Sequence, residues 1–140
     1  MSTNSMAILY PVFALAGLTA LVQVLIPITR VRAALKGRVT VADFTYGESA
    51  AVPPEVSLPN RNYMNLLEFP ILLYVGCLLA YVAAEVTPLM LMLAWGFVGG
   101  RAVHSLIHLT YNHVGHRGIV FGISNTLLVA FWVVMAIHLR

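Results

Sequence analysis

Two groups of polar side chains stand out because each interrupts an apolar stretch. The first is Arg61, Asn65 and Glu68, which precede an apolar run over residues 71–82. At 100° per residue these three lie within about 60° of one another, so a cation, an amide and a carboxylate share one helical face. Ionisable groups cost about 2.5–3.5 kcal/mol inside a bilayer, and they normally face a protein interior or a ligand. This face is therefore a candidate binding site.

The second group is Arg101, His104 and His108, spaced i, i+3, i+7, which again fall within about 60° on one helical face. Arg101 lies near the middle of its apolar segment and needs a partner. Glu68 is the only acidic residue inside a predicted span, and the two lie about 10 and 15 Å from the same membrane surface. We expect Glu68 and Arg101 to form a buried ion pair, a structural role that is compatible with a binding role.

The histidines also suggest a metal site, because an HxxxH pair places two imidazoles on one helical face. His104 and His108 have this spacing, but Glu68 is the only nearby acid to complete a hard-metal site. The several Glu residues and ExxH pairs of diiron proteins are absent from the sequence. We therefore predict no metal, a polar lining role for these two histidines, and loop or interface positions for His113 and His116.

Composition defines the class of protein that must hold these residues. Of the 140 residues, 60% are hydrophobic and only 9% are charged, and the mean hydropathy is +0.87. Soluble domains carry about 25% charged residues, so the chain is predicted to be an integral membrane protein. The net charge of +3 is too small and too scattered to indicate nucleic acid, and the single cysteine allows no disulfide framework.

Four apolar segments are long enough to cross a bilayer core of about 30 Å at about 1.5 Å per residue. We expect helices at about 7–28, 60–82, 88–111 and 118–138 within a single membrane domain, 1–140. The first run is too long for a signal peptide and lacks its basic n-region. The predicted fold is therefore an all-α bundle of four transmembrane helices.

Basic residues predict how this bundle is oriented. Arg30, Arg32, Lys36 and Arg38 follow the first apolar run, and Arg117 lies between the third and fourth. The connection between the second and third runs has no lysine or arginine, so loops one and three are predicted to be cytoplasmic and both termini to face the other side. The basic cluster in loop one is typical of a stop-transfer signal, and a second role in anion binding stays open.

With these features in hand, the chain resembles the MAPEG family, the membrane-associated proteins in eicosanoid and glutathione metabolism. The resemblance covers essentially the whole chain and rests on four motifs in order: a basic end to helix one, R-x3-N-x2-E followed by proline, R-x2-H in helix three, and an arginine opening helix four. The residues that carry them are Arg30 and Arg32, then Arg61, Asn65, Glu68 and Pro70, then Arg101 and His104, and finally Arg117.

The resemblance implies a homotrimer that holds glutathione between neighbouring subunits near the cytoplasmic side. Arg117 would stabilise the glutathione thiolate, since a nearby guanidinium favours the anion. Arg61 would suit a glutathione carboxylate, and Glu68 could accept from its amino group. The implied glutathione-binding positions are Arg30, Arg61, Asn65, Glu68, His104 and His108.

Some positions depart from the family pattern. His108 stands where prostaglandin synthase-type relatives have a tyrosine, and Gly118 replaces a small hydroxyl residue sometimes found after the helix-four arginine. The proline two positions after Glu68 is closer than in the mammalian enzymes and resembles bacterial members. The resemblance thus implies a bacterial-type protein, which we expect in the inner membrane.

Two classes of function follow. The first is a glutathione-dependent transferase or peroxidase that acts on lipophilic small-molecule electrophiles. The second is a non-catalytic lipid-binding or accessory membrane protein that keeps its polar face for assembly. Four cations surround the predicted site against one acid, Glu68, and this surplus favours an anionic ligand. The cations are Arg30, Arg61, Arg101 and Arg117.

Overall fold

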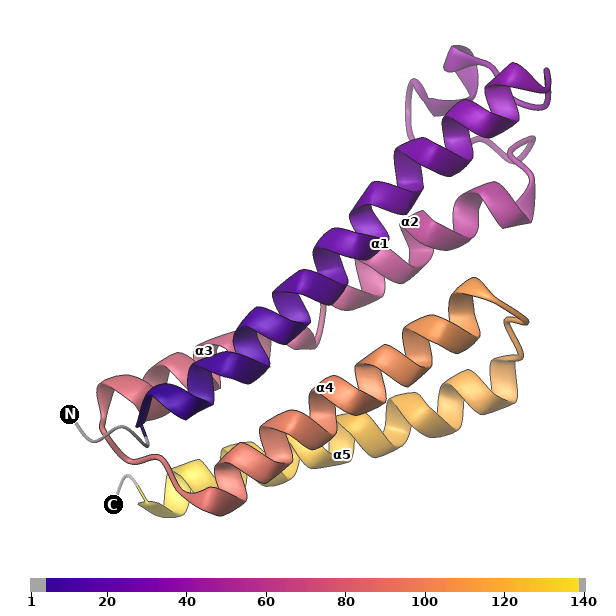
Figure 1. The fold of residues 1–140 in the computed structure, drawn as a ribbon. Helices are drawn as coiled ribbons and strands as arrows, with labels where there is room; N and C mark the ends of the chain where they lie inside the picture. The colour runs from indigo at the N-terminus through magenta and orange to yellow at the C-terminus, as the bar shows by residue number, and fades with distance from the viewer. Residues whose placement is uncertain (1–4, 139–140) are drawn as a thin grey trace.

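Helices form nearly all of the chain in the computed structural model, which describes residues 5–138 (Figure 1). Two short 3-10 helices accompany five α-helices in this range. They are η1 (Ser5–Ile8), α1 (Leu9–Leu35), η2 (Val41–Phe44), α2 (Pro54–Leu67), α3 (Pro70–Val82), α4 (Pro88–Leu109) and α5 (Val114–His138). The predicted all-α fold is confirmed.

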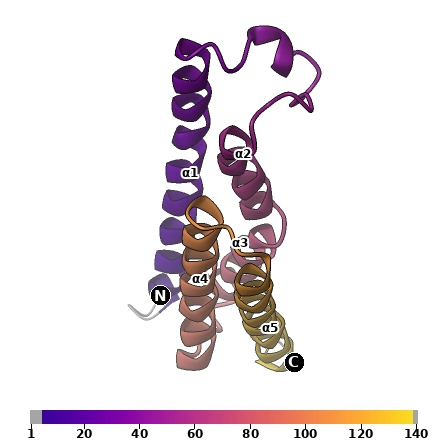
Figure 2. The same ribbon diagram turned by 90° about the vertical axis from the view of Figure 1, so that its right-hand side faces the viewer.

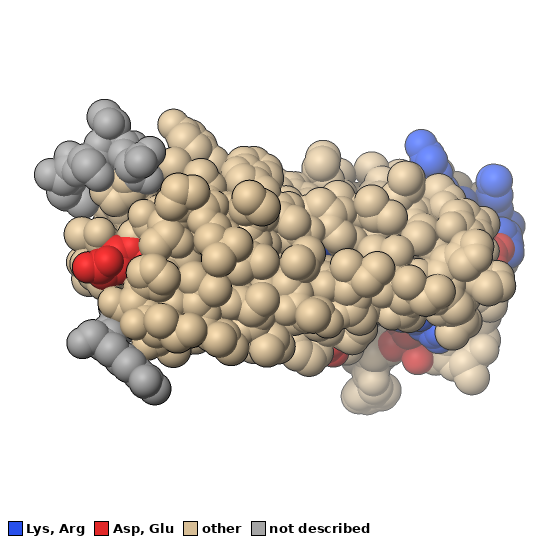
Figure 3. Space-filling view, turned by 90° about the horizontal axis from the view of Figure 1, so that it is seen from below, with Lys and Arg blue, Asp and Glu red and all other residues tan. Residues whose placement is uncertain are grey.

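Four helical stretches are long and apolar enough to cross a membrane within the described range: Ser5–Leu35, Pro54–Val82, Pro88–Leu109 and Val114–His138. The chain is therefore a multi-pass membrane protein. The connection from α1 to α2 and the turn from α4 to α5 lie at one end of the bundle, while the α3–α4 connection, the start of α1 and the end of α5 lie at the other (Figure 1). Charged side chains on the face shown in Figure 3 gather toward the ends of the molecule. The cytoplasmic assignment of loops one and three stays a prediction.

The first helix is longer than the sequence suggested, because α1 continues past residue 28 and takes Arg30 and Arg32 into its last turns. Nothing in this segment breaks a helix before Gly37, which has a left-handed φ of +66°. The amide of Gly37 bonds to the carbonyl of Ala34 and that of Arg38 to the carbonyl of Ala33, a Schellman ending. The basic residues therefore project from a rigid helix, and α1 extends beyond the α4–α5 turn (Figure 2).

The predicted second helix at 60–82 is wrong in two respects. It begins earlier, at Pro54, because a proline at the first helical position already has the right φ and loses no hydrogen bond. It is also interrupted, since α2 ends at Leu67 and α3 begins at Pro70. Pro70 has no N–H to donate and its ring clashes with a preceding helical turn. The result is one span made of two helices with a break beside Glu68.

The last two helices hold the rest of the site. α4 begins after Thr87, whose hydroxyl accepts from the amide of Met90 at 3.2 Å. α5 begins at Val114, four residues before the predicted start, so Arg117 lies in its first turn and not in the loop. The ring of His113 accepts the amide of His116 at 3.3 Å and so satisfies one of the free donors of this helix start.

Close packing of α4 on α5 fixes the two helices against each other. A Cβ added to Gly100 would lie 2.8 Å from the Cβ of Ser124, whereas one added to Gly99 would meet nothing within 4 Å. Gly100 therefore allows the α5 backbone to approach just one residue before Arg101. The core formed by α1, α3, α4 and α5 includes Leu15, Leu73, Phe97 and Phe131.

Candidate functional site

The break between α2 and α3 creates the first element of the site. A helix end leaves its last four carbonyls without helical partners, and Pro70 has no N–H to offer the carbonyl of Leu66. The carbonyl of Asn65 belongs to this last turn, and the guanidinium of Arg101 donates to it through Nη2. The motif that ends in Pro70 therefore supplies a backbone acceptor to α4. The side chain of Asn65 turns back and donates to the carbonyl of Arg61 at 3.1 Å.

Arg101 is the largest fully buried side chain of the described chain, with 0% of its surface exposed. Its Cζ lies 5.4 Å from the ring centroid of Phe121 on α5, so the cation sits between α2 and α5. Its Nε and Nη1 have no hydrogen-bond partner within residues 5–138. A buried charge with two free donors is costly unless another group pairs with it.

His104 and His108 lie on the same face of α4, as predicted. Their rings meet edge to face with centroids 5.7 Å apart, and each side chain is at most 3% exposed. The Nδ1 of each ring lacks a partner in the described part of the chain. Beside them the hydroxyl of Ser105 donates to Oδ1 of Asn62 at 3.2 Å, while the amide nitrogen of Asn62 stays unpartnered.

Arg117 and Arg61 complete the charged environment of these histidines. The positive charges of Arg101 and Arg117 act on His104, and those of Arg117 and Arg61 act on His108. Arg117 is half-buried, its Nη1 donates to Oδ1 of Asn112, and its Nε has no partner within residues 5–138. The structure thus brings five predicted residues together: Arg61, Arg101, His104, His108 and Arg117. We call these five residues the cationic cluster.

The predicted contact between Glu68 and Arg101 is not formed as a direct ion pair. Among the described residues, ion pairs within 4.0 Å join only Arg30 to Glu48 and Arg38 to Glu55. Glu68 is the C-cap residue that follows α2; its side chain is exposed, and its charge acts on Arg101 only at longer range. The reason is the break at Pro70, which turns the last residues of α2 and offers a carbonyl to Arg101.

Arg30 lies apart from the cationic cluster in the single chain. Its Nη2 donates to Glu48 of loop one at 2.9 Å, and its Cζ lies 4.5 Å from the ring centroid of Phe44. It also lines an open groove of about 600 Å³ between α1 and α2, with Asn60 and Tyr63. The structure therefore places Arg30, one of the predicted glutathione-binding residues, on a surface apart from the cationic cluster.

An apolar groove of about 350 Å³ runs along α3 and α5. Phe69, at one end of it, packs edge to face on Phe121 with centroids 5.7 Å apart, and Phe121 contacts both Arg101 and His104. The groove thus adjoins the cationic cluster. Asn125 lines it, and its Oδ1 has no partner within the described range.

Several residues of this site were missed from the sequence. An amide inside an apolar run was a visible signal for Asn125, because polar groups in spans usually have a function. Asn62 and Ser105 lie next to predicted residues, but nothing in the sequence pairs them. Phe121 is one aromatic among several in an apolar helix, and no pattern marks it. No group of three or more His, Cys, Asp or Glu side chains within residues 5–138 could hold a metal ion.

The fold and the cluster define a membrane protein of four helical spans with a cationic site between α2, α4 and α5. The model of the MAPEG family matches residues 8–137, nearly the whole chain, and the chain belongs to this family. The family includes glutathione-dependent transferases and peroxidases as well as non-catalytic members. No curated protein and no solved structure matches the chain.

Proposed function

We propose that the protein is a glutathione-dependent transferase or peroxidase that acts on lipophilic electrophiles. The observation that carries the proposal is the state of Arg101, which is fully buried and has two guanidinium nitrogens without partners in the described chain. A buried cation of this kind calls for an anion with several acceptor oxygens. Glutathione has two carboxylates and a thiol that can ionise.

The donors of the site fit such a ligand. Free nitrogens on Asn62, Arg101 and Arg117 could each donate to a carboxylate or to a thiolate. Arg61 is exposed and free to pair with a carboxylate, and Glu68, also exposed, could accept from the amino group. Bound glutathione would supply the nucleophilic sulfur. The part of Arg117 would be to favour the ionised thiol by placing a positive charge beside it.

The apolar groove along α3 and α5 supports an acceptor substrate that dissolves in lipid. Its lining is almost entirely apolar, from Leu72 and Leu128 to Trp132 and Val133, and it adjoins the cluster through Phe69. A lipophilic electrophile could reach the cluster along this groove without leaving the bilayer. Water would be excluded from most of this path, which protects a nucleophile from side reactions.

We also propose that the site is shared across a homotrimer. Arg30 faces a groove of its own, away from the cationic cluster, so it could bind ligand only at the site of a neighbouring subunit. Native mass spectrometry in mild detergent should show a trimer, and glutathione should be retained by the trimer. A monomer that binds glutathione as well as the assembled protein would refute the shared site.

Calorimetric titration of the detergent-solubilised protein with glutathione tests the proposal. Saturable binding, and conjugation of a lipophilic aryl halide at a rate proportional to folded protein, are expected. Arg61→Gln should weaken binding, whereas Arg32→Gln, a matched change on exposed α1, should not. An absence of binding would favour the alternative, a non-catalytic lipid-binding or accessory member. In that case the role of the buried Arg101 would be structural: it would hold α4 to α2 through its hydrogen bond to the carbonyl of Asn65.

A further inference from the structure

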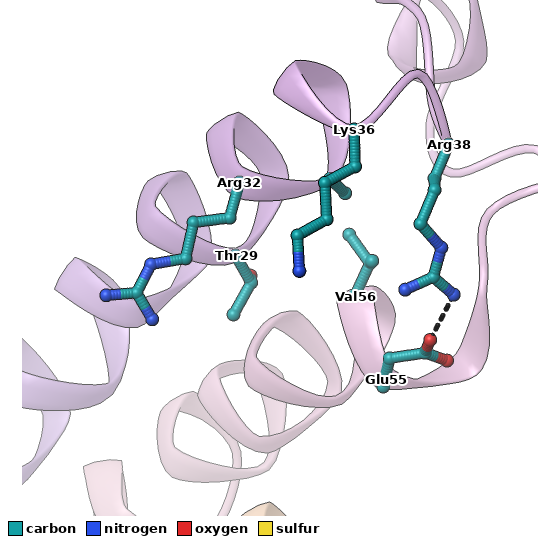
Figure 4. Close-up of a pocket in the computed structure, with 7 residues that line it drawn as sticks. Thr29, Arg32, Lys36, Arg38, Glu55 and Val56 are labelled. Atoms are coloured by element: carbon teal, nitrogen blue, oxygen red, sulfur yellow. Dashed lines mark hydrogen bonds and ion pairs between the residues drawn. The ribbon is translucent and has the colours of Figure 1, made fainter.

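The end of α1 carries a second cationic surface that the proposed function does not use. A pocket of about 130 Å³ lies between the last turns of α1 and the start of α2. Three of the residues that line it are cations, Arg32, Lys36 and Arg38, and one is an acid, Glu55 (Figure 4). One water needs only about 10–15 Å³ of such space, so the pocket is roomy enough to admit a group the size of one phosphate.

The charges of this pocket are not balanced within the chain. Arg38 donates to Glu55, the one ion pair drawn in Figure 4. Arg32 and Lys36 are exposed and form no ion pair within 4.0 Å among residues 5–138. Three cations against one carboxylate leave two positive charges uncompensated on one side of α1. A ligand for this pocket should therefore be an anion.

The position of the pocket along α1 indicates where that anion lies. A bilayer core of about 30 Å takes about 20 helical residues, and we place its edge at Ile28, where the apolar run of the sequence ends before Arg30. Arg32 is then about 6 Å and Lys36 about 12 Å beyond the hydrocarbon edge, at about 1.5 Å per residue. The headgroup layer is about 5–8 Å thick on each side. The side chain of Lys36 turns back along α1 toward Thr29 (Figure 4). Its amino group therefore lies closer to this layer than its position along the helix suggests.

Apolar side chains continue the same face into the bilayer. Leu25 and Ile28 lie within about 80° of Arg32 and Lys36 around the helix axis. Both are partly open, with 37% of each residue exposed. A molecule with an anionic head and an acyl tail would thus meet cations at headgroup depth and apolar surface directly below.

We propose that this pocket binds the phosphate headgroup of an anionic phospholipid in the leaflet on the loop-one side. Arg32 and Lys36 pair with the phosphate, and the acyl chain follows Leu25 and Ile28. Glu55 competes with the lipid for Arg38. This site is separate from the cationic cluster and does not depend on thiol chemistry.

Native mass spectrometry of the trimer, or of whatever assembly the detergent preserves, measures the lipid retained. The protein is titrated with phosphatidylglycerol or with phosphatidylcholine of the same acyl chains. Preferential retention of phosphatidylglycerol is expected. The double variant Arg32→Gln/Lys36→Gln should bind it about 30-fold more weakly, which is about 2 kcal/mol at about 1 kcal/mol for each cation. The charge-preserving swap Arg32→Lys/Lys36→Arg should keep most of the affinity.

Glu55→Gln provides a test that keeps every cation in place. It frees Arg38 and should strengthen phosphatidylglycerol binding about fivefold, the effect of about one added cation. Equal retention of the two lipids, or unchanged binding in the Gln double variant, would overturn the proposal. So would displacement of the lipid by excess inorganic phosphate, because the site would then be one for a soluble anion.

Discussion

Replacing Arg101 by methionine tests whether this buried cation serves to bind a ligand or to stabilise the fold. Methionine has a similar length, so little volume is lost, but the charge is removed. Replacing a buried ion pair by apolar side chains is often neutral or stabilises a soluble protein by about 1–4 kcal/mol, because ions are costly to remove from water, and removing the unpaired Arg101 cation should save part of the same cost. Against this, the carbonyl of Asn65 loses its donor, at a cost of about 1–3 kcal/mol. The two effects nearly cancel, so the melting temperature without ligand should change by only a few degrees.

Glutathione binding should respond differently to the same change. Truncating one partner of a buried charge pair costs about 2–5 kcal/mol of binding free energy, so the affinity of Arg101→Met should fall at least about 30-fold. Saturating glutathione at about 100 times its Kd should raise wild-type stability by about 2.7 kcal/mol. At the same concentration the variant should gain about 1 kcal/mol or less. Thermal unfolding with and without glutathione, together with calorimetry, measures both quantities.

Arg32→Met is the matched control, because it removes the same side chain from an exposed position on α1. It should leave glutathione affinity unchanged. A sharply lower melting temperature for Arg101→Met without ligand, combined with normal glutathione affinity, would refute the reasoning. Arg101 would then be a purely structural residue.

Three further predictions concern other parts of the molecule. Glu48→Gln frees Arg30 from a partly buried ion pair, so glutathione affinity in the trimer should rise up to about fivefold, and an unchanged Kd would remove Arg30 from the site. The side chain of Asp43 accepts from the amide and hydroxyl of Thr40 and from Ser49, which lower the pKa of Asp43 below its usual 3.8. The contribution of Asp43 is therefore full above that value and lost as the pH falls through the lowered pKa. The protection of loop-one amides, measured relative to their unfolded exchange rate at the same pH, should therefore fall only there. At neutral pH the loop-one amides of Asp43→Asn should exchange faster than those of the wild type, and equal rates would contradict this. Gly100→Ala should destabilise the protein by about 1–3 kcal/mol through overpacking on Ser124, whereas Gly99→Ala should be neutral or slightly stabilising, and equal melting temperatures would show that α5 can move away.

The features that follow from local sequence were predicted well. Length and apolar composition indicated the four spans, and helical periodicity placed His104 and His108 on one face of α4. The end of α1 was misplaced because its basic residues were taken for part of loop one, although no proline or glycine lies between Pro27 and Gly37 to end the helix. Pro70 is visible in the sequence, but the sequence does not show whether a proline at this place only kinks a continuous helix or divides the span into two helices.

The partners of the charged residues could not be predicted, because they depend on tertiary contacts. Arg101 pairs with a backbone carbonyl, and a carbonyl carries no signal in the sequence. Counting charges suggested Glu68 instead. The pair of Arg30 with Glu48 joins residues 18 positions apart across loop one, and only the folded loop brings them together.

The ultraviolet absorbance of bound glutathione near neutral pH tests the central claim, that Arg117 holds a thiolate. A free thiol with a pKa of about 8.5 is only a few per cent ionised there, so the pKa of the bound thiol must fall by about two units, or about 2.7 kcal/mol. One guanidinium at about 4 Å in a partly shielded site can supply that much. We expect a thiolate band in the wild-type complex, part of it in Arg117→Lys, and none in Arg117→Ala, which should still bind glutathione through Arg61. A full thiolate band in correctly folded Arg117→Ala would contradict the account.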